Sequence, residues 1–99
     1  MKRPTTVRTA LAARAIGESV ATWRKLHGLT VQQLAEKANA SRSTIGRLEH
    51  GDPSVSFETV LNVCANVGVL DRVVDAIDPY ETDYGRLRAD QELPKRVRN

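Results

Sequence analysis

The sequence predicts an all-α fold of four to five short helices, followed by a charged C-terminal tail. Apolar residues recur at intervals of three and four along most of the chain, which is the spacing of one face of an α-helix. Ser or Thr stands just ahead of several of these segments, where its hydroxyl can cap a helix. The 99 residues include one Trp, two Tyr and one Phe, so the core must be mainly aliphatic, which suits packed helices better than a β-sandwich.

The first helix is expected to begin near Thr9, after a loose basic arm over residues 1–8. Gly17 costs roughly 1 kcal/mol relative to Ala inside a helix, so it marks either a kink or a helix start. Gly28 is suited to left-handed backbone at the end of the segment. The apolar face of this helix comprises Leu11, Ala15, Ile16, Val20 and Trp23.

A second helix is expected after Thr30, because Thr30 and Gln33 have the spacing of a capping box. Asn39 follows this helix and is, after Gly, the residue that best tolerates a left-handed turn. The apolar positions of the helix are Val31, Leu34, Ala35 and Ala38.

Ser41 can cap a third helix over residues 42–49, which Gly51 closes. Only Ile45 and Leu48 in this helix are plainly apolar. Residues 30–51 therefore combine a capped helix, a short turn and a second capped helix with few buried positions. This arrangement is typical of a helix-turn-helix, in which one helix packs on the core and holds the other at a fixed angle for the major groove of DNA.

The third helix turns its polar side chains away from its buried face. Arg42 and Arg47 are expected to contact bases, because the planar fork of arginine matches the O6 and N7 acceptors of guanine. Ser43, with Thr44 at the flank, can donate to bases or phosphates, and Gly46 lets the backbone approach the groove. Taken singly, each arginine could be an ordinary solvated residue, and it is the surrounding motif that favours DNA contact.

Phosphate contacts are expected from helix N-termini and short polar side chains. The residues placed for this role are Thr30, Gln32, Gln33 and Ser41. Thr30 and Ser41 could act as caps alone, although a capped N-terminus still presents free N–H groups, so both roles can coexist. Lys2, Arg3 and Arg8 could follow the DNA backbone, enter the minor groove, or belong to a solvated tail.

Two further helices complete the predicted domain. Ser56 can cap the fourth, Gly68 ends it, and its expected apolar stripe comprises Phe57, Val60, Leu61, Cys64 and Val67. The fifth is expected over residues 70–77, and Asp78-Pro79 stops it. A weak helical pattern recurs near residues 82–90.

The fifth helix is the expected surface of a homodimer. Leu70 and Val74 are expected to pack inward, which leaves Val69, Val73 and Ile77 to extend across a two-fold axis. Two copies related in this way would place their third helices about 34 Å apart, on a palindromic operator in double-stranded DNA.

The charge is divided between the two halves of the chain. Residues 1–51 hold nine Lys or Arg against three Asp or Glu, and residues 52–99 hold six against nine. A basic front half suggests a polyanionic partner, although scatter in a short chain could give the same distribution. The single cysteine, Cys64, excludes an internal disulfide and favours a reducing, cytoplasmic setting. No apolar run is long enough to span a bilayer, so no membrane association is expected.

The residues favour neither an enzyme nor a cofactor. His27 and His50 are expected at opposite helix ends, without metal-ligand spacing to Cys64, so no metal site is expected. Neither a Gly-rich phosphate loop nor a Gly-x-Ser-x-Gly elbow is found. The acidic residues of the second half are interpreted as a solvated face, formed by Asp71, Asp75, Asp78, Glu81 and Asp83.

Residues 16–69 resemble the Cro/C1-type, or XRE-family, helix-turn-helix domain of phage repressors and bacterial regulators. The segments that carry the resemblance are IGESVATWRKLHGLT, LAEKANASRSTIGRLEHG and SFETVLNVCANVGV. The resemblance implies a lambda-repressor-like fold that binds DNA. It also implies that the base-reading positions fall on Arg42, Ser43 and Arg47.

The same resemblance assigns structural roles. It implies that Trp23 packs a hydrophobic corner and that Arg24 and Glu49 form a buried ion pair. Two positions depart from the family pattern. Val31 stands where the family usually has a Gln that touches phosphate, which puts that contact in doubt, and Asn39 replaces the usual Gly of the turn, which changes little.

The tail DPYETDYGRLRADQELPKRVR resembles, less specifically, the C-terminal segment of XRE-type regulators that are paired with HipA-like kinase toxins. Such a resemblance implies an antitoxin that also represses its own operon and contacts the toxin through the tail or the fifth helix. The alternative is a plain charged extension.

The sequence thus predicts three parts: a loose arm over 1–8, a helix-turn-helix domain over 9–78 and a charged extension over 79–99. The expected function is sequence-specific binding of double-stranded DNA by a homodimeric transcriptional regulator, most simply a repressor of its own promoter. Two alternatives stay open, an antitoxin of a HipA-like pair and a protein-interaction module built on the same scaffold.

Overall fold

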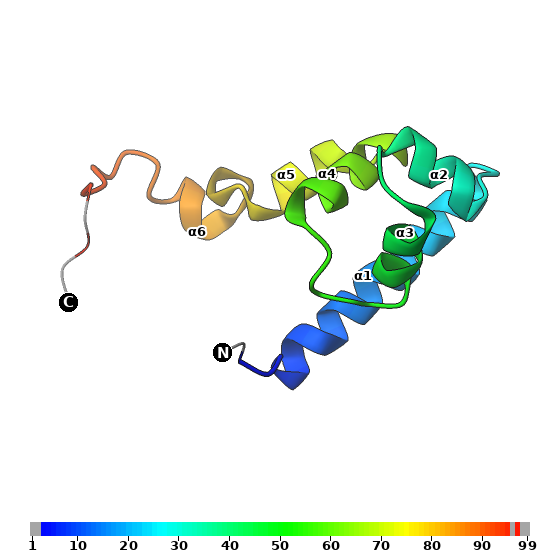
Figure 1. Ribbon diagram of the computed structural model, residues 1–99. Coiled ribbons are helices and arrows are strands. Elements are labelled where there is room, and N and C mark those ends of the chain that lie inside the picture. Colours follow the sequence, from blue (N-terminus) through cyan, green and yellow to red (C-terminus); the bar gives the residue numbers. More distant parts are fainter. Residues whose placement is uncertain (1–2, 96, 98–99) are drawn as a thin grey trace.

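The chain is all-helical, as the sequence predicts, and Figure 1 shows the computed structural model. The structure describes residues 3–95 and 97, so Lys2 of the expected arm lies outside the described residues. In the described part there are no strands, and the helices are α1 (Val7–Leu26), α2 (Val31–Lys37), α3 (Arg42–Glu49), α4 (Phe57–Asn66), α5 (Leu70–Ile77), the 3-10 helix η1 (Pro79–Glu81) and α6 (Asp83–Arg86). None of these helices is long and apolar enough to cross a membrane.

The long helix α1 begins earlier than the sequence predicts and passes through Gly17 as one helix. Thr6 caps it by accepting a hydrogen bond from the Thr9 amide at 3.2 Å, so the expected arm already turns helical at Val7. Gly17 is not a helix start. It is buried against the end of α3, where an added methyl group would press on the carbonyl oxygen of Leu48 and lie 2.8 Å from that of Glu49. Glycine is therefore needed for the close approach of α1 and α3.

The caps of α2 and α3 form as predicted. In the capping box, Thr30 Oγ1 accepts from the Gln33 amide at 3.0 Å and Gln33 Oε1 accepts from the Thr30 amide at 2.8 Å. Ser41 Oγ accepts from the Thr44 amide at 3.0 Å at the start of α3. Between the helices, Asn39 adopts left-handed backbone with φ 54°. The helix-turn-helix is thus set by local hydrogen bonds as well as by packing.

The core lies where α1, α2, α3 and α4 meet, and α5 leads away from it toward η1 and α6 (Figure 1). It is aliphatic, as the composition predicts, and Trp23 and Val31 pack partly buried against it. Its buried members are Val20, Leu34, Ala35, Ala38, Ile45, Leu48, Val55, Val63, Cys64 and Val67.

Several predicted apolar stripes are only partly buried. In α1, Val20 is buried, whereas Leu11 and Ile16 are exposed because the first half of the helix extends beyond the core. In α4, the prediction for Phe57 is wrong, since 73% of its surface is exposed at the first turn. The buried face of α4 is centred instead on Val63, which the predicted stripe omitted and which has no exposed surface.

The orientation of α5 also differs from the prediction. Val69 packs against the core, so it is not free to extend across a dimer axis. Val74 does not pack inward, since 56% of its surface is exposed, and Ile77 is 82% exposed as expected. After Asp78 and Pro79 end α5, a short η1–α6 unit follows. It extends away from the helical bundle in Figure 1.

Candidate nucleic-acid interface

The third helix is held in place by one buried face. Ile45 has no exposed surface and Leu48 is buried beside it, while Gly17 brings the backbone of α1 against the last turn of α3. α3 lies against both α1 and α2 (Figure 1). Because Arg42, Ser43 and Arg47 are exposed on its other face, α3 can present side chains outward at a fixed angle.

An ion pair fastens the end of α3 to the end of α1. Arg24 Nε donates to Glu49 Oε2 at 2.7 Å, and its Nη2 donates to Oε1 at 3.1 Å. The remaining nitrogen, Nη1, donates to the carbonyl oxygen of Leu29 at 2.9 Å. The two side chains are only 12% and 9% exposed, and the hydrogen bond to Glu49 raises the pKa of Arg24. This is the ion pair that the resemblance to the XRE family implies. Its nitrogen donors and carboxylate oxygens bind groups within the fold.

The outward face of α3 carries the residues expected to read bases. Arg42, Ser43 and Arg47 are exposed on this face. Thr44 is half-buried, and its hydroxyl lies 2.8 Å from the Ser41 hydroxyl, so it supports the cap. A face with two guanidinium groups and one free hydroxyl can donate hydrogen bonds to base edges and to phosphate oxygens.

Arg47 has an acidic partner that the sequence analysis missed. Arg47 Nε donates to Asp52 Oδ2 at 2.9 Å. The other carboxylate oxygen, Oδ1, accepts from the Ser54 amide at 2.8 Å and from the Ser54 hydroxyl at 2.6 Å. These bonds lower the pKa of Asp52 to about 2, with the Ser54 hydroxyl as the largest cause, then the Ser54 amide and Arg47. The sequence shows Asp52-Pro53-Ser54 as a loop, and the turn that begins at Gly51 is what brings its carboxylate back to Arg47.

The residues expected to contact phosphate lie at the start of α2 and α3. The Oε1 of Gln33 is used in the capping box, whereas its Nε2 can still donate. Gln32 Nε2 donates to Glu36 Oε1 at 3.1 Å, which holds the amide along the surface of α2. Val31, at the position where the family usually has Gln, packs half-buried against the core.

The first turns of the helices differ in charge. The first turns of α1, α2 and α3 contain no acidic residue. Those of α4, α5 and α6 contain Glu58, Asp71 and Asp83. Since a helix N-terminus carries partial positive charge, the first three helices keep that charge uncompensated by their own side chains.

His27, His50 and Cys64 each have contacts or burial that suit a structural role. His27 is the C-cap of α1, with Nε2 2.9 Å from the Val67 carbonyl oxygen, and His50 is the C-cap of α3, with Nδ1 2.6 Å from that of Gly46. Burial raises the pKa of the Cys64 thiol. Over residues 3–95 and 97, no cluster of three His, Cys, Asp or Glu is arranged to hold a metal ion.

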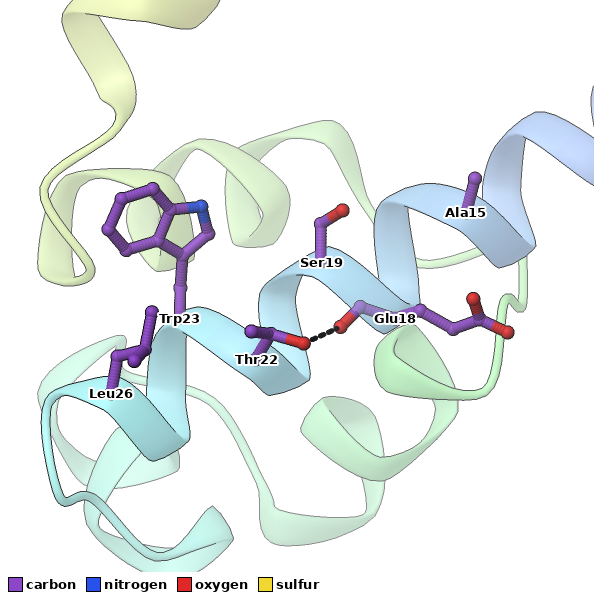
Figure 2. A pocket seen from close by; sticks show the side chains of 6 residues that line it. All are labelled: Ala15, Glu18, Ser19, Thr22, Trp23 and Leu26. Atoms are coloured by element: carbon purple, nitrogen blue, oxygen red, sulfur yellow. Dashed lines mark hydrogen bonds between the residues drawn. The ribbon is translucent and has the colours of Figure 1, made fainter.

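Trp23 lines an apolar groove together with Cys64, Val69 and Val73. It stacks near His27, with ring centroids 6.2 Å apart, and lies partly buried against the core. Figure 2 shows it on one face of α1, and the side chains drawn with it are Ala15, Glu18, Ser19, Thr22 and Leu26. Its indole is therefore used in packing.

Comparison with known proteins agrees with this geometry. A family model described as helix-turn-helix matches residues 20–69, from the second half of α1 to the residue before α5. The chain is also similar to "Antitoxin PezA" of Streptococcus pneumoniae serotype 4 (strain ATCC BAA-334 / TIGR4), with 30% identity over 73 residues. The similar region covers 67% of this chain and 46% of that protein, so the chain spans less than half the length of this relative.

Proposed function

Because this chain belongs to the helix-turn-helix family of DNA-binding domains, we propose that it is a sequence-specific regulator of transcription that binds double-stranded DNA through α3. The observation that carries the proposal is the division of α3 into two faces. Ile45 and Leu48 fix one face in the core, and the other presents Arg42 and Arg47 to solvent. A helix held in this way can enter the major groove without loss of packing.

The roles within the interface follow from the donors that the fold leaves available. Arg42, Ser43 and Arg47 would contact base edges. Ser41 and Thr44 at the start of α3 would contact the phosphate backbone. On the start of α2, Thr30, Gln32 and Gln33 would do the same, since phosphate contacts commonly fix the register of such domains on DNA.

We propose that the regulator acts as a homodimer on a palindromic site. Exposed apolar side chains on α5 support this, namely Val73, Val74 and Ile77. Beside them, an apolar groove of about 280 Å³ runs between α1, α4 and α5, and its walls include Ile16, Trp23 and Val73. A single domain of this size reads few base pairs, whereas two copies on a two-fold axis would read half-sites about 34 Å apart.

The direct test is fluorescence anisotropy with the protein's own upstream DNA and a scrambled duplex, at two salt concentrations. A preference of ~10³ or more for the upstream DNA, retained at the higher salt, would support a regulator of its own promoter, and repression is then measured with a reporter gene. Equal binding to both duplexes that collapses with salt would contradict sequence-specific regulation. It would favour a protein-interaction module on this scaffold.

A second candidate function is that of an antitoxin. It is favoured by the similarity to a protein named as an antitoxin, and by an ordered η1–α6 unit that projects from the bundle (Figure 1). In this proposal the DNA-binding domain represses the operon, and α5 or the tail beyond residue 78 binds the toxin, for which the tail's resemblance implies a HipA-like kinase.

Growth rescue tests the antitoxin proposal. The reading frame next to this one is expressed with the full chain, with a chain that ends at residue 78, and with Arg47→Ala. Rescue by the full chain and by Arg47→Ala would support an antitoxin, and failure of the truncated chain would place the contact in the tail. Absence of toxicity, or no rescue, would contradict it.

A further inference from the structure

The carboxylate of Asp52 connects the reading face of α3 to the loop that follows it. Its Oδ2 accepts from Arg47 Nε at 2.9 Å, and its Oδ1 is fixed by the amide and hydroxyl of Ser54 at 2.8 and 2.6 Å. Each oxygen thus has its own partner: Ser54 in the loop holds Oδ1, and Arg47 on α3 binds Oδ2.

A hydrogen bond from Nε restricts how a guanidinium group can turn, because the group is planar and its five N–H donors form a rigid fork. With Nε of Arg47 bound to Asp52, the edge formed by Nη1 and Nη2 is left for DNA. That edge matches the O6 and N7 acceptors of guanine.

We propose that Asp52 is a positioning residue for base recognition, which orients Arg47 so that its two terminal nitrogens meet a guanine in the major groove. This inference rests on the proposed DNA-binding function and deepens it. Asp52 would not contact the guanine itself, since an ionised carboxylate only accepts hydrogen bonds and would repel the O6 and N7 acceptors.

The exposure of the Arg47–Asp52 contact argues that this contact serves to orient Arg47, whereas the part that Asp52 plays in stability comes mainly from its two bonds to Ser54. The Arg47 and Asp52 side chains are 48% and 32% exposed, and exposed ion pairs contribute little to folding. An arginine already held in its binding geometry loses less conformational freedom on binding, so its contact can discriminate more strongly between bases. The lowered pKa keeps Asp52 ionised wherever the protein would bind DNA.

The test is selection of binding sites from a randomised duplex pool, followed by titration of every single-base variant of the selected site. The proteins are the natural chain, Arg47→Ala, Asp52→Asn, Asp52→Ala and Ser54→Ala. Glu18→Gln serves as a charge-matched control, since Glu18 is an exposed acid on α1. Circular dichroism and thermal unfolding confirm that each variant is folded, and Asp52→Asn and Ser54→Ala are the mildest changes.

Arg47→Ala first identifies the base pair that Arg47 reads, with an expected loss of about 5- to 150-fold in discrimination at that position alone. Asp52→Ala is expected to lose about tenfold at the same base pair and to keep its preferences elsewhere, with smaller losses for Asp52→Asn and Ser54→Ala. Glu18→Gln and the Asp52 variants are all expected to gain affinity uniformly from the lost negative charge, and this gain leaves base preferences unchanged.

Three results would overturn the inference. The Asp52 variants could keep the full preference at the Arg47 position, they could lose preference equally at all positions, or they could gain preference there, which would mean that Asp52 restrains Arg47. If the natural chain itself selects no motif, the proposed function fails together with the inference. A motif that the Asp52 variants leave unchanged overturns the inference alone.

Discussion

The guanidinium of Arg24 binds both carboxylate oxygens of Glu49, at 2.7 and 3.1 Å, and so ties the last turn of α1 to the last turn of α3. The contact lies between two helices that also meet at Gly17, where their backbones are too close for a methyl group. Besides the buried side chains of Ile45 and Leu48, the position of α3 therefore depends on one polar contact and one steric contact, and each can be removed separately.

Removal of one partner of the ion pair should destabilise the fold strongly. Arg24→Ala or Glu49→Ala is expected to lower the free energy of unfolding by about 3–5 kcal/mol, because the remaining charge stays buried without its partner. Urea denaturation followed by circular dichroism measures the change. Glu18→Ala is the control, since the Arg14–Glu18 pair is exposed and 4.0 Å apart, and its loss should cost at most about 1 kcal/mol. Equal effects at both pairs would contradict this assignment.

Two glycines should respond to alanine in opposite directions. Gly17→Ala is expected to destabilise the protein, because the new methyl group would press on the Leu48 carbonyl oxygen. Gly46→Ala has nothing within 4 Å of the added methyl group, so it should stabilise α3 by about 0.5–1 kcal/mol. Thermal unfolding distinguishes them. A stabilising Gly17→Ala would show that α1 and α3 are not in close contact.

Arg42 and Arg47 on α3 should each determine which base the protein prefers at one position of its DNA site. Arg42→Ala and Arg47→Ala are each expected to cost about 1–3 kcal/mol of binding to the preferred site and to relax selection at different base pairs. Arg88→Ala, in the C-terminal extension, is the control for loss of one positive charge. A variant that weakens binding to all sequences equally would have lost a phosphate contact instead.

The dimer proposal makes a prediction for α5. Ile77 is 82% exposed, so Ile77→Asp should leave the monomer folded and prevent self-association through this surface. Analytical ultracentrifugation measures the association. Leu87→Asp is matched in type and exposure but lies beyond α6, and it should still dimerise. A natural chain that sediments as a monomer at working concentration would contradict the dimer itself.

The loss of folding stability in acid should depend on Asp52. The pKa of Asp52 falls from 3.8 to about 2 in the folded protein. The ionised carboxylate therefore stabilises the fold fully above pH 3.8, and this stabilisation is lost as the pH falls toward about 2. The unfolding midpoint in urea should therefore drop more steeply between about pH 4 and pH 2 in the natural chain than in Asp52→Asn. Parallel curves would show that the Ser54 and Arg47 bonds do not persist in solution.

Local features of the fold could be predicted from the sequence, and orientations could not. The caps at Thr30 and Ser41 act within one turn, so the start of α2 and the span of α3 follow from residue type and spacing. Burial on α4 and α5 depends on how each helix crosses its neighbours. For that reason Phe57 and Val74, although apolar and correctly spaced, lie outside the core.

In the candidate DNA-binding site too, one part could be predicted from the sequence and another could not. The outward position of Arg42 and Arg47 follows from helical periodicity once Ile45 and Leu48 are taken as buried. The partner of Arg47 could not be predicted, since it lies five residues ahead, beyond the end of the helix. Its approach depends on the left-handed backbone of Gly51, with φ 87°, and on the Ser54 bonds that fix the carboxylate.

The neutral caps of α2 and α3 limit how this protein can be made more stable. Aspartate caps a helix about as well as serine and suits the positive end of the helix dipole, so Ser41→Asp would be chosen by selection for stability alone. On the proposed interface, that carboxylate would face DNA phosphates and weaken binding by charge repulsion. Selection for a more stable fold and selection for tighter DNA binding would therefore diverge at Thr30 and Ser41, whereas acids in the first turns of α4 to α6 carry no such conflict.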